Sequence, residues 1–133
     1  MIITRPGDQE GAAGNRRSKM TGTAFPYVTM PATDGVVINT VNFTPGAHTY
    51  WHEHERGQIL QVLAGRGLVQ SEGGPVEVVR AGDTVWCPPG ERHWHGASPE
   101  SYMVHTAISL GATSWADPVD DSDYHDPEAR EEQ

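Results

Sequence analysis

Short runs of strand-forming residues, separated at regular intervals by turn-forming residues, constrain the fold of this chain more than any other feature. From Val36 onward, runs rich in Val, Ile, Thr and aromatic residues alternate with Gly and Pro signals roughly every 8–12 residues. The signals are Pro45-Gly46, Gly65, Gly73-Gly74-Pro75, Gly82-Asp83 and Pro88-Pro89-Gly90. The pattern predicts antiparallel strands at about 36–43, 48–54, 58–64, 67–71, 76–80, 84–87, 93–96 and 102–109, and no helix in this stretch. That many strands can close a barrel or pack as two sheets.

The length of the chain, 133 residues, fits one domain with one modest core. We expect a flexible N-terminal arm over 1–20, where apolar periodicity is missing, and a β-barrel over 21–116. An acidic C-terminal tail follows over 117–133. Trp115 and Tyr124 are the aromatic residues that could fasten this tail to the barrel.

Charge and composition exclude several classes of function. The chain carries 9 Lys+Arg against 18 Asp+Glu, a formal charge of −9, so nucleic acid is not expected as a partner. No apolar run approaches the roughly 20 residues that span a bilayer, and no signal peptide is recognisable, so we expect a cytoplasmic protein without membrane contact. One cysteine excludes an internal disulfide, whereas seven histidines offer ligands.

Histidine spacing suggests a metal site. Side chains alternate faces along a strand, so His52 and His54 share one face, and Gln58 opens the next strand toward the same point. His93 follows the turn at 88–90 and supplies another imidazole. One His-x-His alone is more often surface or core, but a second at 93–95 strengthens the hypothesis. Three neutral imidazoles and an amide oxygen suit one divalent transition metal (Mn, Fe, Co, Ni or Zn) with coordination positions left open.

The other histidines and the aromatic residues allow more than one interpretation. His105 is either a packed core residue or, if its strand lines the barrel, a candidate base that faces inward with Met103, Ala107 and Ser109. His48 and His125 are expected at the surface. Cys87 is expected to be buried and unreactive. The tryptophans at 51, 86, 94 and 115 are expected in core or barrel-end packing, with Trp94 directed away from the metal.

Two motifs resemble those of the cupin superfamily. The first consists of Gly46, His52-Glu53-His54, Gln58 and Gly65, and the second of Gly82, Pro88-Pro89-Gly90 and His93. Gln58 stands where most cupins have glutamate, and Ala97 replaces the final Asn of the second motif. The resemblance implies an all-β fold, a single-domain cupin with a double-stranded β-helix or jelly-roll barrel. A neutral ligand at Gln58 would leave more positive charge on the metal and strengthen its Lewis acidity.

A narrower resemblance joins the chain to small bacterial cupins related to carboxymuconolactone decarboxylase-associated proteins, including manganese-dependent hydroxynitrile lyases. The segments that carry it are 57–58, 72–77, 88–97 and 103–108. It implies manganese as the favoured ion and His105 as base with help from His95. It implies His52, His54, Gln58 and His93 as metal ligands, and by position Asn39, Val41 and His95 would line the pocket. Leu60 and Met103, on the inward faces of their strands, complete the expected substrate-pocket residues. Glu53, Glu55 and Ser109 depart from the pattern common in that group, so the resemblance leaves the substrate open.

The expected function is that of a metal-dependent lyase acting on a small carbonyl or hydroxy compound, with the metal as Lewis acid and a histidine as base. One alternative is an Fe(II)-dependent oxygenase, because histidine ligands with open positions also suit Fe(II) and O₂. Another is a non-catalytic cupin that binds a small molecule or a metal. The expected partners are a small-molecule substrate and a second copy of the chain in a homodimer.

Overall fold

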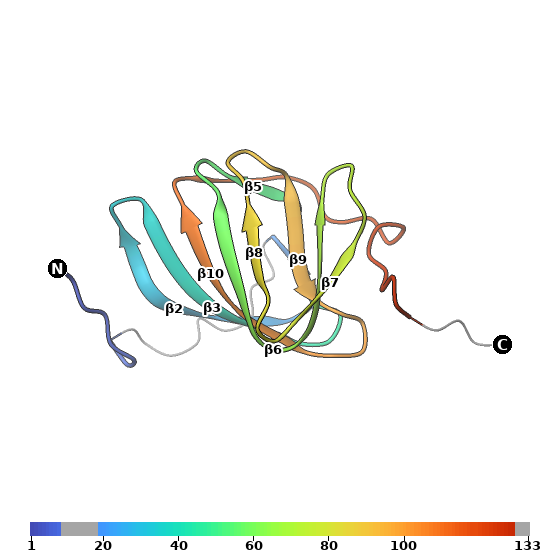
Figure 1. Cartoon of the computed structure of the whole chain (residues 1–133), viewed down its shortest axis with the longest axis horizontal. Coiled ribbons are helices and arrows are strands. Elements are labelled where there is room, and N and C mark those ends of the chain that lie inside the picture. Colours follow the sequence, from blue (N-terminus) through green and yellow to red (C-terminus); the bar gives the residue numbers. More distant parts are fainter. Residues whose placement is uncertain (9–18, 130–133) are drawn as a thin grey trace.

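The computed structural model describes residues 1–8 and 19–129, and its regular structure in those residues consists of strands alone (Figure 1). No helix in that part of the chain is long and apolar enough to cross a membrane. The strands are β1 Met20–Thr21, β2 Ala24–Thr33, β3 Val36–Phe43, β4 His48–Thr49, β5 His52–His54, β6 Gln58–Ser71, β7 Glu77–Arg80, β8 Thr84–Cys87, β9 His93–Ala97, β10 Met103–Leu110 and β11 Thr113–Trp115.

The strands form one strongly curled sheet that encloses the core like a half-barrel (Figure 1). Along its main path the order is β1-β4-β9-β6-β10-β3-β2. Strand β6 links both walls, since its first half pairs with β10 and β8 and its second half with β9 and β7. Gly65 lies at the bend with a positive φ of 79°, and a Cβ there would collide with the backbone carbonyl of Tyr102. The structure therefore confirms the predicted all-β, barrel-like fold.

The observed strands differ from the predicted ones in several places. The expected strands at 58–64 and 67–71 are one bent strand, β6, and the expected strand at 48–54 is divided into β4 and β5. The sequence pattern missed β2, whose Pro26 and Pro31 argue against a central strand. Prolines are tolerated there because β2 ends the path of the sheet. The pattern also missed the short strands β1 and β11.

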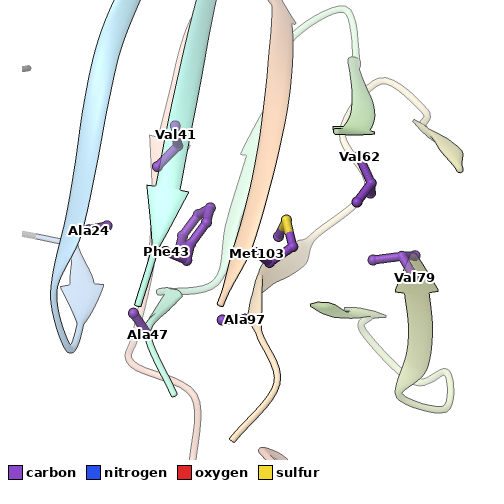
Figure 2. Packing of buried hydrophobic residues seen from close by; sticks show 8 residues of the cluster. All are labelled: Ala24, Val41, Phe43, Ala47, Val62, Val79, Ala97 and Met103. Atoms are coloured by element: carbon purple, nitrogen blue, oxygen red, sulfur yellow. The ribbon is translucent and has the colours of Figure 1, made fainter. Parts of the chain in front are cut away.

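The main core lies between the two walls of the curled sheet (Figure 2). Phe43 and Met103 are its largest fully buried side chains. Burial of each stabilises the fold by about 1.5–3 kcal/mol. Burial alternates strictly along β10, which places His105 on the inner face with Met103, Ala107 and Ser109. The interpretation of His105 as an inward-facing residue of the barrel wall therefore holds.

The C-terminal segment packs on the outer face of β6, β7 and β9. Val119 is buried in a cluster with Trp51, Leu68, Val76 and Trp94. Tyr124 donates a hydrogen bond from its hydroxyl to the carbonyl of Ala97 at 2.6 Å, and Arg66 forms an ion pair with Asp126. The described part of the predicted acidic tail, up to residue 129, is therefore in contact with the barrel. Residues 130–133, and residues 9–18 of the predicted flexible arm, lie outside the described residues.

The tryptophans divide between two environments. Trp51 and Trp94 are buried in the cluster under the C-terminal segment, and Trp94 points away from the inner face as expected. The prediction of packing was wrong for Trp86, which is 53% exposed on the outer face. Its side chain can remain in solvent because the barrel wall already closes behind it through the pairing of β8 with β6.

Candidate metal centre

The sheet register gathers six polar side chains on the inner face. His52 and His54 lie on β5, and His93 on β9 pairs directly opposite His52. His95 shares the face of His93, since residues two apart on a strand point the same way. Gln58 opens β6, and His105 enters from β10. All six side chains are buried.

Two of these histidines have their ring orientation fixed by the backbone. Nδ1 of His52 lies 2.8 Å from the carbonyl oxygen of Tyr50, and Nδ1 of His93 lies 2.9 Å from that of Glu91. A carbonyl oxygen can only accept, so each Nδ1 carries the proton and each Nε2 presents a lone pair. Neutral imidazoles held in this way are typical metal ligands.

Gln58 points its amide oxygen at the same place. Its Nε2 donates to the hydroxyl of Ser109 at 3.0 Å, which leaves Oε1 3.0 Å from Nε2 of His93. Both of these facing atoms carry lone pairs, so a cation bound between them would relieve their mutual repulsion. The donor set therefore fits a divalent transition metal.

Three further ring nitrogens are buried without a hydrogen-bond partner among the described residues: Nε2 of His54, Nε2 of His95 and Nδ1 of His105. Buried polar atoms normally have partners, so this concentration in one cavity marks a ligand site. Ring nitrogens of His52, His93 and His95 all lie within 4.8 Å of one another. The structure thus adds His95 to the candidate ligands, and the set of His52, His54, Gln58 and His93 stays a prediction.

Burial keeps the histidines neutral. Burial and then the neighbouring His93 lower the pKa of His52 to about 3 and that of His54 to about 4. Burial likewise lowers the pKa of His105 to about 4 and, with the adjacent His105, holds the pKa of His95 well below its usual range. Neutral imidazole is the form that binds a metal or accepts a proton.

Five of the six polar side chains line a cavity of about 290 Å³, namely all except His93. Its volume lies near the lower end of the range for small-molecule sites, about 300–1,000 Å³. Asn39 and Val41 line it, as the sequence predicts, but Leu60 and Met103 do not. Leu60 packs with Cys87 and Ala107 in a separate cluster, and Met103 is fully buried in the main core. Cys87 is buried, and burial raises the pKa of its thiol to about 12, which makes it unreactive.

Sequence reasoning missed Thr113 and Trp115 as cavity residues. The Thr113 hydroxyl lies 3.0 Å from Nδ1 of His54, and the Trp115 ring lies 4.6 Å from that of His52. Both line the cavity. No motif spacing marks them, because β11 reaches the site through its pairing with β5 and not through the barrel repeat.

The surface assignment of His48 was wrong, whereas His125 is exposed as expected. The His48 ring is only 4% exposed because the C-terminal segment stacks Tyr124 on it, with ring centroids 4.0 Å apart. The stacking partner is 76 residues away in sequence (124 minus 48), so the local pattern around His48 could not reveal it.

The fold and the histidine cluster define a small β-barrel protein with a polar, histidine-lined cavity. Residues 39–108 match the cupin domain family, and the chain belongs to that family. It is 42% identical over 130 residues to (R)-mandelonitrile lyase of Granulicella tundricola, covering 93% of this chain and 98% of the relative.

Solved structures agree on the fold. A cupin-like protein from Thermotoga maritima superposes with a TM-score of 0.81 at 32% identity, covering 90% of this chain and 95% of the other. A polyketide cyclase from Streptomyces resistomycificus superposes with a TM-score of 0.72 at 18% identity, covering 92% of this chain and 91% of the other, a likeness of fold alone. The protein is therefore a cupin that resembles a lyase and carries residues able to hold a metal ion.

Proposed function

We propose that the protein is a metal-dependent lyase that cleaves and forms the carbon–carbon bond of small hydroxynitriles. The observation that carries the proposal is the group of unpartnered ring nitrogens that faces the cavity. The similarity to a mandelonitrile lyase over nearly the whole chain supports the choice of reaction. A divalent ion bound here would supply Lewis-acid stabilisation of charge that develops on a substrate oxygen.

The hydrogen bond between His95 and His105 links the roles of these two residues. It joins Nδ1 of His95 to Nε2 of His105 at 2.8 Å, and only one of these atoms can carry the shared proton. When His95 donates, its own Nε2 is bare and can bind a metal, but His105 then carries its proton on Nδ1. When His105 donates, its Nδ1 is bare and can act as a base, and His95 presents an Nε2–H. His95 as a ligand and His105 as the base are therefore alternatives.

We favour the arrangement in which His105 donates to His95, with His52, His54, Gln58 and His93 as the metal ligands. Nδ1 of His105 then takes the hydroxyl proton of the hydroxynitrile, the oxygen electrons form the carbonyl, and the bond to the nitrile carbon breaks with its electron pair on cyanide. His105 passes its Nε2 proton to Nδ1 of His95, and the Nε2 proton of His95 goes to cyanide.

This relay releases an aldehyde and hydrogen cyanide and leaves both imidazoles neutral. Neutrality suits the site, because burial disfavours the imidazolium form of both residues. The reverse reaction, addition of hydrogen cyanide to an aldehyde, begins from the tautomers that cleavage leaves behind.

The Fe(II) oxygenase alternative has weaker support. The usual non-haem Fe(II) site combines two histidines with one carboxylate. Among the described residues, no Asp or Glu lines the cavity. Oxygen consumption in the presence of Fe(II) and candidate substrates would favour this alternative.

The test begins with the untagged protein, its metals quantified by mass spectrometry and its cleavage of mandelonitrile followed by the absorbance of benzaldehyde. We expect near-stoichiometric manganese or another divalent transition metal, and cleavage that depends on it. His93→Ala should lose both the bound metal and the cleavage activity. His125→Ala, a matched change of an exposed histidine, should keep both. A wild-type protein that binds metal but does not cleave mandelonitrile would favour the alternative of a non-catalytic binding protein.

Manganese as the bound ion, the homodimer and the cytoplasmic location stay predictions. Light scattering tests the homodimer.

A further inference from the structure

The three histidines proposed as metal ligands are not held in the same way. His52 and His93 each use a backbone carbonyl two residues earlier in the chain to fix Nδ1. His54 has no such bond, and its Nδ1 lies 3.0 Å from the hydroxyl oxygen of Thr113. The ring of His54 therefore depends on a side chain from a different strand.

That strand, β11, lies beyond residues 39–108, the part that matches the cupin family. It pairs antiparallel with β5 so that Thr113 is opposite His54. Two backbone hydrogen bonds flank this pairing. The amide of Glu55 donates to the carbonyl of Ala112 at 2.8 Å, and the amide of Ala116 donates to the carbonyl of Trp51 at 2.9 Å. Thr113 is thus presented to His54 in a fixed register.

The tautomer of His54 decides whether it can bind a metal. A proton on Nδ1 leaves Nε2 as a lone pair, whereas a proton on Nε2 removes that lone pair. Nε2 of His54 is buried and has no hydrogen-bond partner among the described residues, so an N–H there would be an unsatisfied donor. A hydroxyl that accepts from Nδ1–H favours the metal-binding tautomer.

We propose that Thr113 is a positioning residue of the metal centre, whose hydroxyl accepts a hydrogen bond from Nδ1–H of His54 and so directs the Nε2 lone pair into the cavity. This inference rests on the metal site of the proposed function. Thr113 touches neither substrate nor metal in this role and acts only through His54. Outer partners of metal-binding histidines commonly change metal affinity by about 10–100-fold when removed.

Two substitutions at one position separate the hydroxyl from the shape of the side chain. Thr113→Val keeps the β-branched shape, which suits a strand, and removes the hydroxyl. Thr113→Ser keeps the hydroxyl. Thr44→Val is the matched control, because the Thr44 hydroxyl also makes a partly buried hydrogen bond, to the carbonyl of Thr23 at 2.7 Å, away from the cavity.

The first measurement is the affinity of the metal-free full chain for Mn²⁺ and for Zn²⁺, by titration against a competing chelator. Thr113→Val should bind each ion about 10–100-fold more weakly than wild type. Thr113→Ser and Thr44→Val should bind like wild type. Wild-type affinity in Thr113→Val would overturn the proposal, as would equal weakening in Thr44→Val.

The second measurement is the nitrogen NMR spectrum of the His54 ring in the metal-free protein, assigned by its loss in His54→Gln. Wild type and Thr113→Ser should show the proton on Nδ1, and Thr113→Val should show a mixture of tautomers. An unchanged ring spectrum in Thr113→Val would refute the role of the hydroxyl. If wild type binds no metal, the proposed function fails, and the ring spectrum alone then decides the part played by Thr113.

Discussion

The molecule buries histidine in two regions, and in only one of them are buried ring nitrogens left without a hydrogen-bond partner among the described residues. On the outer face, His48 stacks on Tyr124, its Nδ1 lies 2.8 Å from the carbonyl of Gly46, and Trp94 completes its surroundings. On the inner face, Nε2 of His54, Nε2 of His95 and Nδ1 of His105 are buried without a hydrogen-bond partner in the part of the chain that the structure describes. Both regions are equally hidden from solvent.

The difference shows that burial alone does not identify a functional histidine. His48 contributes aromatic packing and one backbone hydrogen bond, which a core residue can supply. The inner residues leave ring nitrogens without hydrogen-bond partners facing one cavity, which lowers stability unless a ligand binds there. Substitutions on the outer face should therefore change mainly the stability of the fold. Substitutions on the inner face should change mainly metal binding and turnover.

The largest difference between the regions is expected in catalysis. His105→Gln should lower turnover of mandelonitrile by about 10²–10⁴-fold, because a positioned general base contributes that much, while metal content stays at the wild-type level. His48→Gln should retain turnover. The two kcat values, measured with metal content determined in the same samples, test the contrast. Similar losses in both variants would remove the distinction between the two regions.

Acid should destabilise the metal-free protein through the inner region. In the unfolded chain the imidazole of His105 takes up a proton below about pH 6.5, whereas in the folded protein burial lowers the pKa of His105 to about 4. The free energy of unfolding should therefore be level above pH 6.5 and fall as the pH drops toward 4, by up to roughly 3 kcal/mol for His105 alone. Urea titrations from pH 4.5 to 8 measure this slope. His105→Gln should flatten it, and a steeper slope in that variant would contradict the assignment.

Metal binding should stabilise the fold through the inner region only. Ion at about 100 times its dissociation constant should add about 2.7 kcal/mol to the free energy of unfolding, since the unfolded chain lacks the assembled site. His48→Gln should gain the same increment from a lower starting stability, and His93→Ala should gain almost nothing. Thermal unfolding with and without Mn²⁺ gives both increments. A reduced increment in His48→Gln would show that the outer region supports the metal centre.

The smallest expected effect belongs to the outer region. Tyr124→Phe removes the hydroxyl that donates to Ala97 but keeps the ring that stacks on His48. The variant should lose about 0.5–1.5 kcal/mol of stability and keep its metal affinity. Tyr102→Phe, at a tyrosine that is 53% exposed, is the control and should stay within about 0.5 kcal/mol of wild type. Equal stabilities for the two variants would show that the bond to Ala97 contributes nothing.

Much of the fold could be predicted because antiparallel strands and turns leave local traces in the sequence. Alternation along 102–109 correctly placed His105 on the inner face, and the glycine and proline signals divided the chain close to the observed strand ends. Strand β2 escaped because its prolines oppose a central strand, and its place beyond β3 in the sheet order follows from long-range pairing. That β6 continues as one strand through Gly65 also follows from long-range pairing, with β10 and β8 in one wall and with β9 and β7 in the other.

By itself, the sequence determined the strand periodicity, the shared face of His52 and His54, and the turn that sets Gln58 close after them, because these depend on neighbours along the chain. The motif resemblance pointed to His93, whose place opposite His52 depends on the long-range pairing of β9 with β5. Tertiary structure decided which ring nitrogens lack hydrogen-bond partners and that Tyr124 covers His48. It also decided that Leu60 and Met103 lie outside the cavity lining and that Thr113 contacts His54. Those outcomes depend on contacts between distant segments, and a local pattern holds no record of the segment that will pack against it.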